Sequence, residues 1–323
     1  MQLDASRTGL IISRMENTLD REVEQEATAE AEVESCSGFV LTEGDIEIFR
    51  LVLQHRFLRR EQLSILTRRP PKRLHRRLLI LVKRGFLTTL RFPLQKHIYG
   101  IGRAAMPVLA EQGMTNEDLL DQRLRTSELS ELFLKHEMMI VDIHVILTTA
   151  SYQGAVRLVD WREGRELYDF VVAADHKGSG RLPVRPDAFF TIEDSRRPEG
   201  ANRAHFALEA DRSTANQTRF EEKIRAYWHY IQQGLHAKKY GVKGFRVLTI
   251  TITDKRAKSL CALAAAVLPE SARKYFLFAP LYDVSVDDPM SASTCYSPRT
   301  ADSDQRHPLV PAPNQLQKES AVV

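Results

Sequence analysis

The spacing of apolar residues in the first third of the chain predicts several short helices and a β-ribbon. A capping-box-like start at Thr42-Glu-Gly-Asp45 precedes the first helix, which the apolar spacing extends to His55. Further helices are predicted at 60–67, 70–84 and 102–110, and β-prone runs at 86–91 and 96–99. Because three short helices followed by a two-stranded ribbon is the order of a winged helix-turn-helix, we predict that domain at residues 42–113.

The pattern changes in the second part of the chain, where helices alternate with β-prone runs. Helices are predicted at 132–148, 220–231 and 255–268, and strands at 156–160, 167–173, 185–192, 205–211, 245–253 and 275–279. This order predicts a mixed sheet covered by helices at residues 125–280. The expected fold class is therefore α+β or α/β, with a winged helix-turn-helix followed by a mixed-sheet domain.

Composition places the chain among globular proteins and separates its two ends from the rest. Of its 323 residues, 43% are hydrophobic and 27% are charged. Residues 1–41 are acidic and predict a disordered arm, and residues 281–323 are rich in Ser, Pro, Asp and Gln and predict a disordered tail. No apolar run is long enough to cross a membrane, and three distant cysteines give no disulfide framework. We expect a cytoplasmic location.

Positive charge is concentrated in the predicted winged helix. Residues 50–96 contain fourteen Lys or Arg and a single acid, Glu61. Solvated helix faces usually mix both signs, so this asymmetry predicts binding of double-stranded DNA. The expected DNA-binding residues are Lys72, Arg73, Arg76, Arg77, Lys83, Arg84, Arg91 and Lys96. Among them, Arg73, Arg76 and Arg77 are candidates for base edges, whereas Arg91 and Lys96 in the ribbon are candidates for phosphate.

The second part offers one candidate for chemistry. Asp187 lies at the start of a predicted strand, Glu209 and Asp211 end the next one, and Lys223 lies on the following helix. Hydrolysis of a phosphodiester with Mg²⁺ needs carboxylates from adjacent strand ends and a nearby cation. Asp187, Glu209 and Lys223 are thus candidate catalytic residues, and Asp187, Glu209 and Asp211 are candidate ligands for Mg²⁺. The alternative is structural, with acids that cap loops or pair with arginines.

The element order and several motifs resemble the replication-relaxation family of bacterial plasmid and mobile-element proteins, from about residue 42 to residue 280. The motifs are residues 134–142, Arg185-Pro-Asp187, residues 206–214 and residues 223–227. The resemblance implies a winged helix and a domain similar to the PD-(D/E)xK nuclease fold, acting in plasmid replication and DNA relaxation. Asp211 stands where the nuclease motif carries Lys, which makes Lys223 a candidate for the migrated equivalent and Glu137 a candidate third acid.

Three functions follow from these observations. The first is a DNA-binding protein needed for replication or relaxation of a plasmid or mobile element, and the second is a Mg²⁺-dependent endonuclease that nicks or cleaves DNA. The third is a winged-helix transcriptional regulator whose second domain dimerises or binds an effector. The chain lacks the G-x-x-x-x-G-K-[ST] motif, which argues against an ATPase motor. The expected partner is double-stranded DNA, with a homodimer as a further candidate and no membrane.

Overall fold

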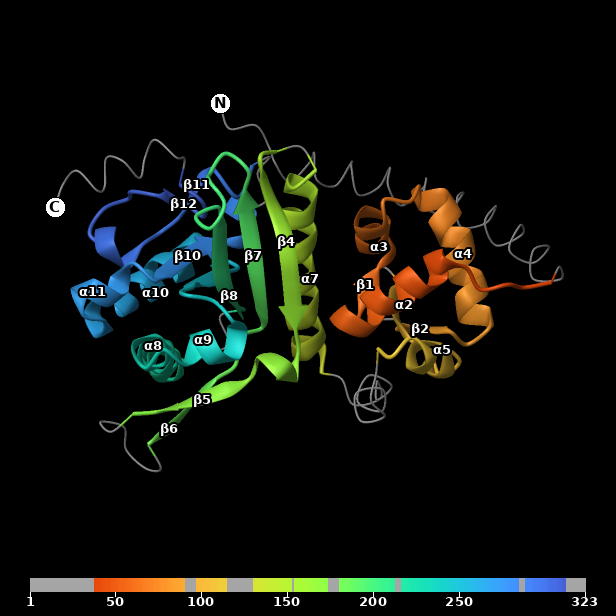
Figure 1. The fold of residues 1–323 in the computed structure, drawn as a ribbon, viewed down its shortest axis with the longest axis horizontal. Coiled ribbons are helices and arrows are strands. Elements are labelled where there is room, and N and C mark those ends of the chain that lie inside the picture. Colours follow the sequence, from red (N-terminus) through yellow and green to blue (C-terminus); the bar gives the residue numbers. More distant parts are fainter. Residues whose placement is uncertain are drawn as a thin grey trace. The chain divides into compact units, whose positions relative to one another are not determined.

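A computed structural model describes residues 38–90, 97–114, 130–152, 154–173, 180–212, 216–284 and 288–311 (Figure 1). The chain forms two compact units, residues 1–130 and 131–323. Helices combine with a mixed five-stranded sheet, which confirms the α+β class. Most of the predicted acidic arm (1–37) and the ribbon residues Arg91 and Lys96 lie outside the described residues. Within the described segments, no helix combines the length and apolarity that a membrane crossing needs.

The first unit packs short helices against a small antiparallel sheet. Its helices are α2 (Glu43–His55), α3 (Arg60–Thr67), α4 (Pro71–Lys83) and α5 (Ala105–Glu111), and its strands are β1 (Leu58–Arg59), β2 (Leu87–Leu90) and β3 (Ile98–Ile101). Strand β3 lies between β1 and β2 and is antiparallel to both. Fully buried side chains from all parts of the unit form its core, among them Phe49, Val52, Phe57, Leu63, Leu78 and Leu81.

Helix α4 begins and ends where the sequence predicts. Pro71 occupies its first turn, where the missing N–H of proline has no helical partner to lose. At the other end, Gly85 has a φ of 74°. Its N–H donates to the carbonyl of Val82, and the N–H of Phe86 donates to that of Leu81. This pair of bonds is the Schellman arrangement that ends helices at glycine.

The second unit is built on a five-stranded mixed sheet. Its strand order is β10 (Phe276–Pro280), β9 (Arg246–Thr251), β8 (Arg203–Asp211), β7 (Ala188–Asp194) and β4 (Val156–Glu163). The first three strands are mutually parallel, and β8, β7 and β4 are antiparallel. The predicted strand at 185–192 starts later, at Ala188, because residues 185–187 link β7 to another short strand. Pro186 suits this link, since proline cannot donate to a strand ladder.

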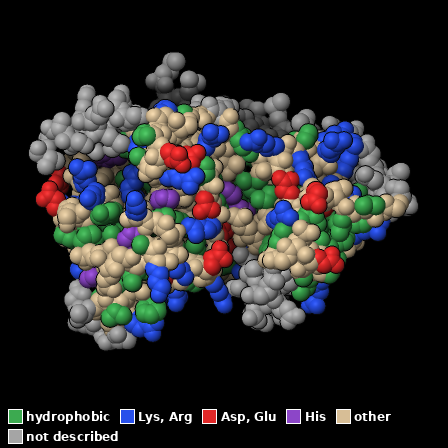
Figure 2. All heavy atoms as spheres, in the orientation of Figure 1, with side chains coloured by type: hydrophobic (Ala, Val, Ile, Leu, Met, Phe, Trp, Pro, Cys, Tyr) green, Lys and Arg blue, Asp and Glu red, His purple; other side chains and the backbone are tan. Residues whose placement is uncertain are grey.

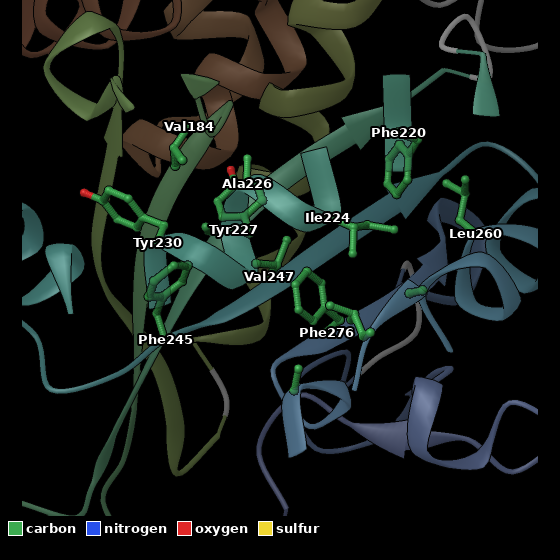
Figure 3. Close-up of a cluster of buried hydrophobic side chains, with 14 of the residues drawn as sticks. Val184, Phe220, Ile224, Ala226, Tyr227, Tyr230, Phe245, Val247, Leu260 and Phe276 are labelled. Atoms are coloured by element: carbon green, nitrogen blue, oxygen red, sulfur yellow. The ribbon is translucent and has the colours of Figure 1, made fainter. Parts of the chain in front are cut away.

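Both faces of this sheet are covered, so its strands are apolar on both sides. Helix α7 (Glu131–Ala150) covers one face together with segments after residue 280. Helices α8 (Gln217–Gln232) and α10 (Asp254–Val267) cover the other. Figure 3 shows this second cluster, in which Ile224 and Tyr227 of α8 pack with Val247 and Phe276 of the sheet.

Smaller elements complete the second unit. They are η1 (Arg165–Leu167), α9 (Leu235–Tyr240) and α11 (Glu270–Arg273), together with the β5–β6 ribbon. That ribbon consists of β5 (Asp169–Val172) and β6 (Arg181–Val184), which pair with each other in a separate antiparallel sheet. Val171, Leu182 and Val184 anchor it to the core beneath α8.

The segment after residue 280 differs from the predicted disordered tail. It contains α12 (Leu281–Val284), β11 (Ser293–Cys295), η2 (Pro298–Thr300) and β12 (His307–Pro308). Met290, Cys295, Leu309 and Val310 are buried against the α7 face of the sheet, and Arg306 pairs with Asp254 and Asp283. A few buried apolar side chains fix this segment, although its overall composition is polar. Residues 312–323 lie outside the described part.

We predict that Leu309→Ala destabilises the second unit. Leu309 is completely buried, so its removal leaves a cavity in the core. The free energy of unfolding, measured by chemical denaturation, should fall by about 2–5 kcal/mol. The exposed neighbour Gln305 provides the control, because Gln305→Ala should change stability by less than about 0.5 kcal/mol. Equal effects of the two substitutions would mean that this segment is not part of the folded core.

Candidate functional site

Asp187 is held beside Glu209 by the pairing of β7 and β8. Its backbone N–H donates to the carbonyl of Leu208 (2.9 Å), and its Oδ2 accepts from the N–H of Ala210 (2.8 Å). The register pairs Ala188 with Leu208, so the next positions along the two strands bring Asp187 next to Glu209. The structure thus brings together the two acids that the sequence places at neighbouring strand ends.

Glu209 is buried on β8 and is contacted by two side chains of α8. Only 2% of the residue is exposed. Its Oε1 accepts from the hydroxyl of Tyr227 at 2.5 Å, and its Oε2 forms an ion pair with the ammonium group of Lys223. Lys223 and Tyr227 are four residues apart, which puts both on the same side of the helix. Lys223, predicted from the sequence, therefore joins the acids together with Tyr227, the last residue of the 223–227 motif.

A histidine of α7 contacts Asp187. His136 Nε2 lies 3.1 Å from Asp187 Oδ1. The charge of Glu137, the predicted third acid, raises the pKa of this histidine and also that of Tyr168. The contact between His136 and Asp187 depends on how α7 packs against the sheet, which the sequence alone does not indicate.

Asp211 has a different partner from the other two acids. Its carboxylate accepts from Arg256 Nε at 2.7 Å, which ties the end of β8 to α10. Asp211 and Glu209 are two residues apart and so lie on the same side of the strand, and the charge of Asp211 still acts on Lys223. Among the described residues, no three or more His, Cys, Asp or Glu side chains gather to hold a metal ion.

The two central acids have pKa values shifted in opposite directions. For Asp187, burial opposes ionisation most strongly, but the hydrogen bond and charge of His136 and the charge of Lys223 together outweigh it and lower the pKa. For Glu209, burial dominates and raises the pKa, despite the opposing charge of Lys223, and the neighbouring Asp187 adds to the rise. Acids whose environments separate their pKa values in this way are typical of reaction centres.

The cationic partners of these acids respond to them. Burial alone would lower the pKa of Lys223, but the carboxylates of Glu209 and Asp187 outweigh burial and raise it. Burial would also lower the pKa of His136, which the hydrogen bond and charge of Asp187 and the charge of Glu137 raise instead. The cluster therefore holds two acids facing two groups that favour the protonated, positive state.

The predicted DNA-binding residues of α4 fall into two groups. Lys72 and Arg73 in its first turn are exposed, as are Lys83 and Arg84 at its end, and Arg76 is half-buried. Arg77 instead forms a bidentate pair with the buried Asp45, at 2.8 and 2.6 Å, and donates to the carbonyl of Val40. This pairing makes Arg77 a structural cation that fastens α4 to the start of α2.

These observations define a two-unit α+β protein with a buried acid–cation cluster at the end of the β7–β8 pair. Comparison with protein families identifies a match: residues 49–245, more than half of the chain, match the replication-relaxation family. The chain belongs to this family, which suggests a role in plasmid replication and relaxation. No curated protein and no solved structure matches the chain.

The His136–Asp187 pair predicts a pH-dependent contribution to stability. Because the folded-state pKa of His136 is raised above its ordinary value of 6.5, the contribution is complete below 6.5 and is lost as the pH rises through the folded-state value. Wild type should therefore exceed His136→Gln in unfolding free energy by more at about pH 5.5 than at about pH 8.5, as measured by urea denaturation. A difference independent of pH would show that His136 carries no charge that matters to folding.

Proposed function

We propose that this protein processes DNA during plasmid replication and relaxation, with a first unit that binds duplex DNA and a second unit that hydrolyses a phosphodiester bond. Family membership supports the biological setting. The observation that carries the enzymatic part is the meeting of Asp187, Glu209 and Lys223 at the end of two paired strands. These are the side chains that phosphodiester hydrolysis requires, and they come from separate elements.

The first unit has the element order of a winged helix-turn-helix. Helix α2, strand β1, helices α3 and α4, and strands β2 and β3 follow one another, and both β1 and β2 pair with β3. In such domains the third helix enters the major groove, and its N-terminal residues contact base edges. The first turn of α4 carries the exposed Lys72 and Arg73, which favours this orientation.

We therefore assign the DNA contacts by position on α4. Lys72, Arg73 and Arg76 belong to the part that faces bases, and Lys83 and Arg84 belong to the end that faces phosphate. Arg77 is excluded because Asp45 and the backbone of Val40 use its guanidinium group. Arg91 and Lys96, in the β-prone runs that the sequence predicts at 86–91 and 96–99, remain proposed phosphate contacts.

The second unit is proposed to be a PD-(D/E)xK-like domain. Asp187 and Glu209 correspond to the two acids of that motif, and Asp211 stands where the motif has lysine. Lys223 pairs with Glu209 from the neighbouring helix, which supports the view that the cation has moved to α8. Asp211, engaged by Arg256, then serves the fold, not the reaction.

The chemistry of the acid pair fits a Mg²⁺ ion. This ion prefers oxygen ligands, keeps several waters, and is often bound by one or two carboxylates together with substrate phosphate. A third protein ligand is therefore not required, and Asp187 and Glu209 would hold the ion. The raised pKa of Glu209, caused first by its burial and also by the adjacent Asp187, describes a negative site that a cation would relieve. Bound Mg²⁺ would supply Lewis acidity at the phosphate.

The remaining side chains have positioning and charge-balancing roles in this proposal. Tyr227 orients the carboxylate of Glu209 through its hydroxyl. Lys223 is charged, and 42% of its side chain is exposed to solvent. It can therefore balance negative charge on a phosphate. His136 orients Asp187 through the contact between Nε2 and Oδ1, and its raised pKa favours the protonated ring.

A second candidate is a winged-helix regulator whose second unit only dimerises or binds an effector. One observation favours it: each acid of the cluster already has a cationic partner, namely His136, Lys223 or Arg256. A network neutralised in this way is also what a structural role needs. The two functions differ in whether the acids are needed for a reaction.

Nicking of supercoiled plasmid tests the enzymatic proposal. We predict that wild-type protein produces nicked or linear DNA in Mg²⁺, and that Asp187→Asn and Glu209→Gln each reduce the rate at least about a hundredfold, or about 2.7 kcal/mol. Glu193→Gln provides the matched control, because Glu193 lies at the other end of β7 and pairs with the exposed Arg203. Wild-type protein that leaves the plasmid supercoiled would favour the regulator.

Duplex binding tests the role of α4. Changing Lys72 and Arg73 together to Ala should weaken binding by about 1–3 kcal/mol per lost base contact and reduce its salt dependence. The control changes Arg50 and Arg103 to Ala, which removes the same charge from exposed positions on other parts of the unit. Equal weakening in both double variants, measured by fluorescence anisotropy, would attribute binding to net charge and remove α4 from the interface.

A further inference from the structure

The β5–β6 ribbon (Figure 1) has an outward face that is not part of the acid cluster. Alternate residues of a strand point to the same side, and the inward side of this ribbon is buried in the core. The outward side carries Phe170, Val172, Arg181 and Pro183, and the exposed flanking residues Tyr168 and Arg185 continue the same alternation. We call these six residues the outward face. Its three large apolar side chains, at positions 168, 170 and 172, are 42%, 44% and 55% exposed, which is unusual for alternate positions along one short segment.

Both aromatic rings of this face have a guanidinium group nearby. The guanidinium carbon of Arg181 lies 3.5 Å from the centroid of the Phe170 ring, and that of Arg185 lies 5.7 Å from the centroid of the Tyr168 ring. In Figure 2, hydrophobic and basic side chains lie side by side at the lower edge, where Figure 1 shows β5 and β6. Exposed rings accompanied by arginine are the groups on which proteins stack nucleic-acid bases.

The ribbon is fixed from behind, and its acid is turned inward. The carboxylate of Asp169 accepts from the hydroxyl of Tyr230 at 2.8 Å, and Gln233 donates to the carbonyl of Val172 at 2.8 Å. Both contacts come from the α8 region, so the ribbon is anchored to the same helix that carries Lys223. The acid of β5 is thus already engaged on the inner side, and the outward face keeps its positive charge.

The outward face continues into the acid cluster. Arg185 precedes Asp187 by two residues. The pKa of Tyr168 is raised, first by burial and then by the carboxylates of Asp187 and Glu137, which places the Tyr168 hydroxyl within reach of their charge. A strand lying along the ribbon would therefore lead to the acid pair.

We infer that the outward face of the β5–β6 ribbon binds an unpaired DNA strand beside the acid pair, with bases stacked on Phe170 and Tyr168 and phosphates facing Arg181 and Arg185. The inference rests on the proposed function, in which the second unit acts on DNA. A duplex keeps its base faces stacked inside the double helix, so exposed rings recognise a strand that has been opened. The positive charge of the face complements a polyanion better than the apolar surface of a second protein chain.

Binding of a labelled single-stranded oligonucleotide of about 20 nucleotides to the full-length protein tests this inference, with a hairpin duplex measured in parallel. Changing Tyr168 and Phe170 together to Ala should raise the Kd for the single strand about tenfold or more and leave the Kd for the duplex unchanged. Phe170→Trp should retain binding, because indole also stacks. Tyr282→Ala is the matched control, since Tyr282 is an exposed aromatic (59%) away from the ribbon. Thermal unfolding checks that each variant is folded.

The outcomes separate this inference from the proposed function. If the double variant binds the single strand as tightly as wild type, the ribbon inference is wrong, while duplex binding and nicking by wild type would leave the proposed function intact. Wild type could instead fail to bind duplex and to nick plasmid, yet bind the single strand more tightly than the double variant does. In that case the ribbon inference holds and the proposed function fails. If sedimentation shows that wild type is a dimer and the double variant is a monomer, the outward face is a self-association surface. That result overturns the inference.

Discussion

The burial of the Glu209 carboxylate is the constraint on which the second unit depends. Placing a charge away from water costs several kcal/mol unless a partner neutralises it. Lys223 and Tyr227 provide that partner from α8, so this helix has to pack with one particular side against β8. Asp187 adds a second negative charge at the same strand ends, and His136 of α7 pairs with it. Helices on opposite faces of the sheet are thus both oriented by one pair of acids.

The same rule explains which charges serve the fold and which remain for function. Asp45 is buried within the first unit, and Arg77 neutralises its charge. This arginine is therefore not available to DNA. Arg256 does the same for Asp211. Lys72 and Arg73 lie on an exposed turn of α4. The burial of Asp45 and of Asp211 therefore gives Arg77 and Arg256 structural roles.

Much of this arrangement could be predicted from sequence, because it follows from local patterns. Helical spacing gave the helices of the first unit, and Gly85 gave the end of α4. The acids at neighbouring strand ends could be paired because consecutive antiparallel strands are adjacent, and Lys223 because it lies near the start of the next helix. These inferences need only periodicity and chain order.

What the sequence could not provide depends on distant partners. The contact of His136 with Asp187 depends on a rotation of α7 that packing against the sheet decides. The sequence predicts Arg77 as a DNA contact, since nothing local indicates its partner Asp45, which lies 32 residues earlier in the chain. The segment around Leu309 looked disordered because a few buried residues in a polar stretch carry little signal until the sheet that covers them is known. Strand β1, two residues long, owes its existence to pairing with β3.

The central claim is that the acid cluster is a metal-dependent reaction centre and not only a structural network. The most direct test is the melting temperature of wild type and of Asp187→Asn, measured with and without about 10 mM Mg²⁺. A ligand that binds only the folded state stabilises it by mass action, so our account predicts that Mg²⁺ raises the melting temperature of wild type and not that of the variant. An equal response of the two proteins to Mg²⁺, or none in either, would contradict it.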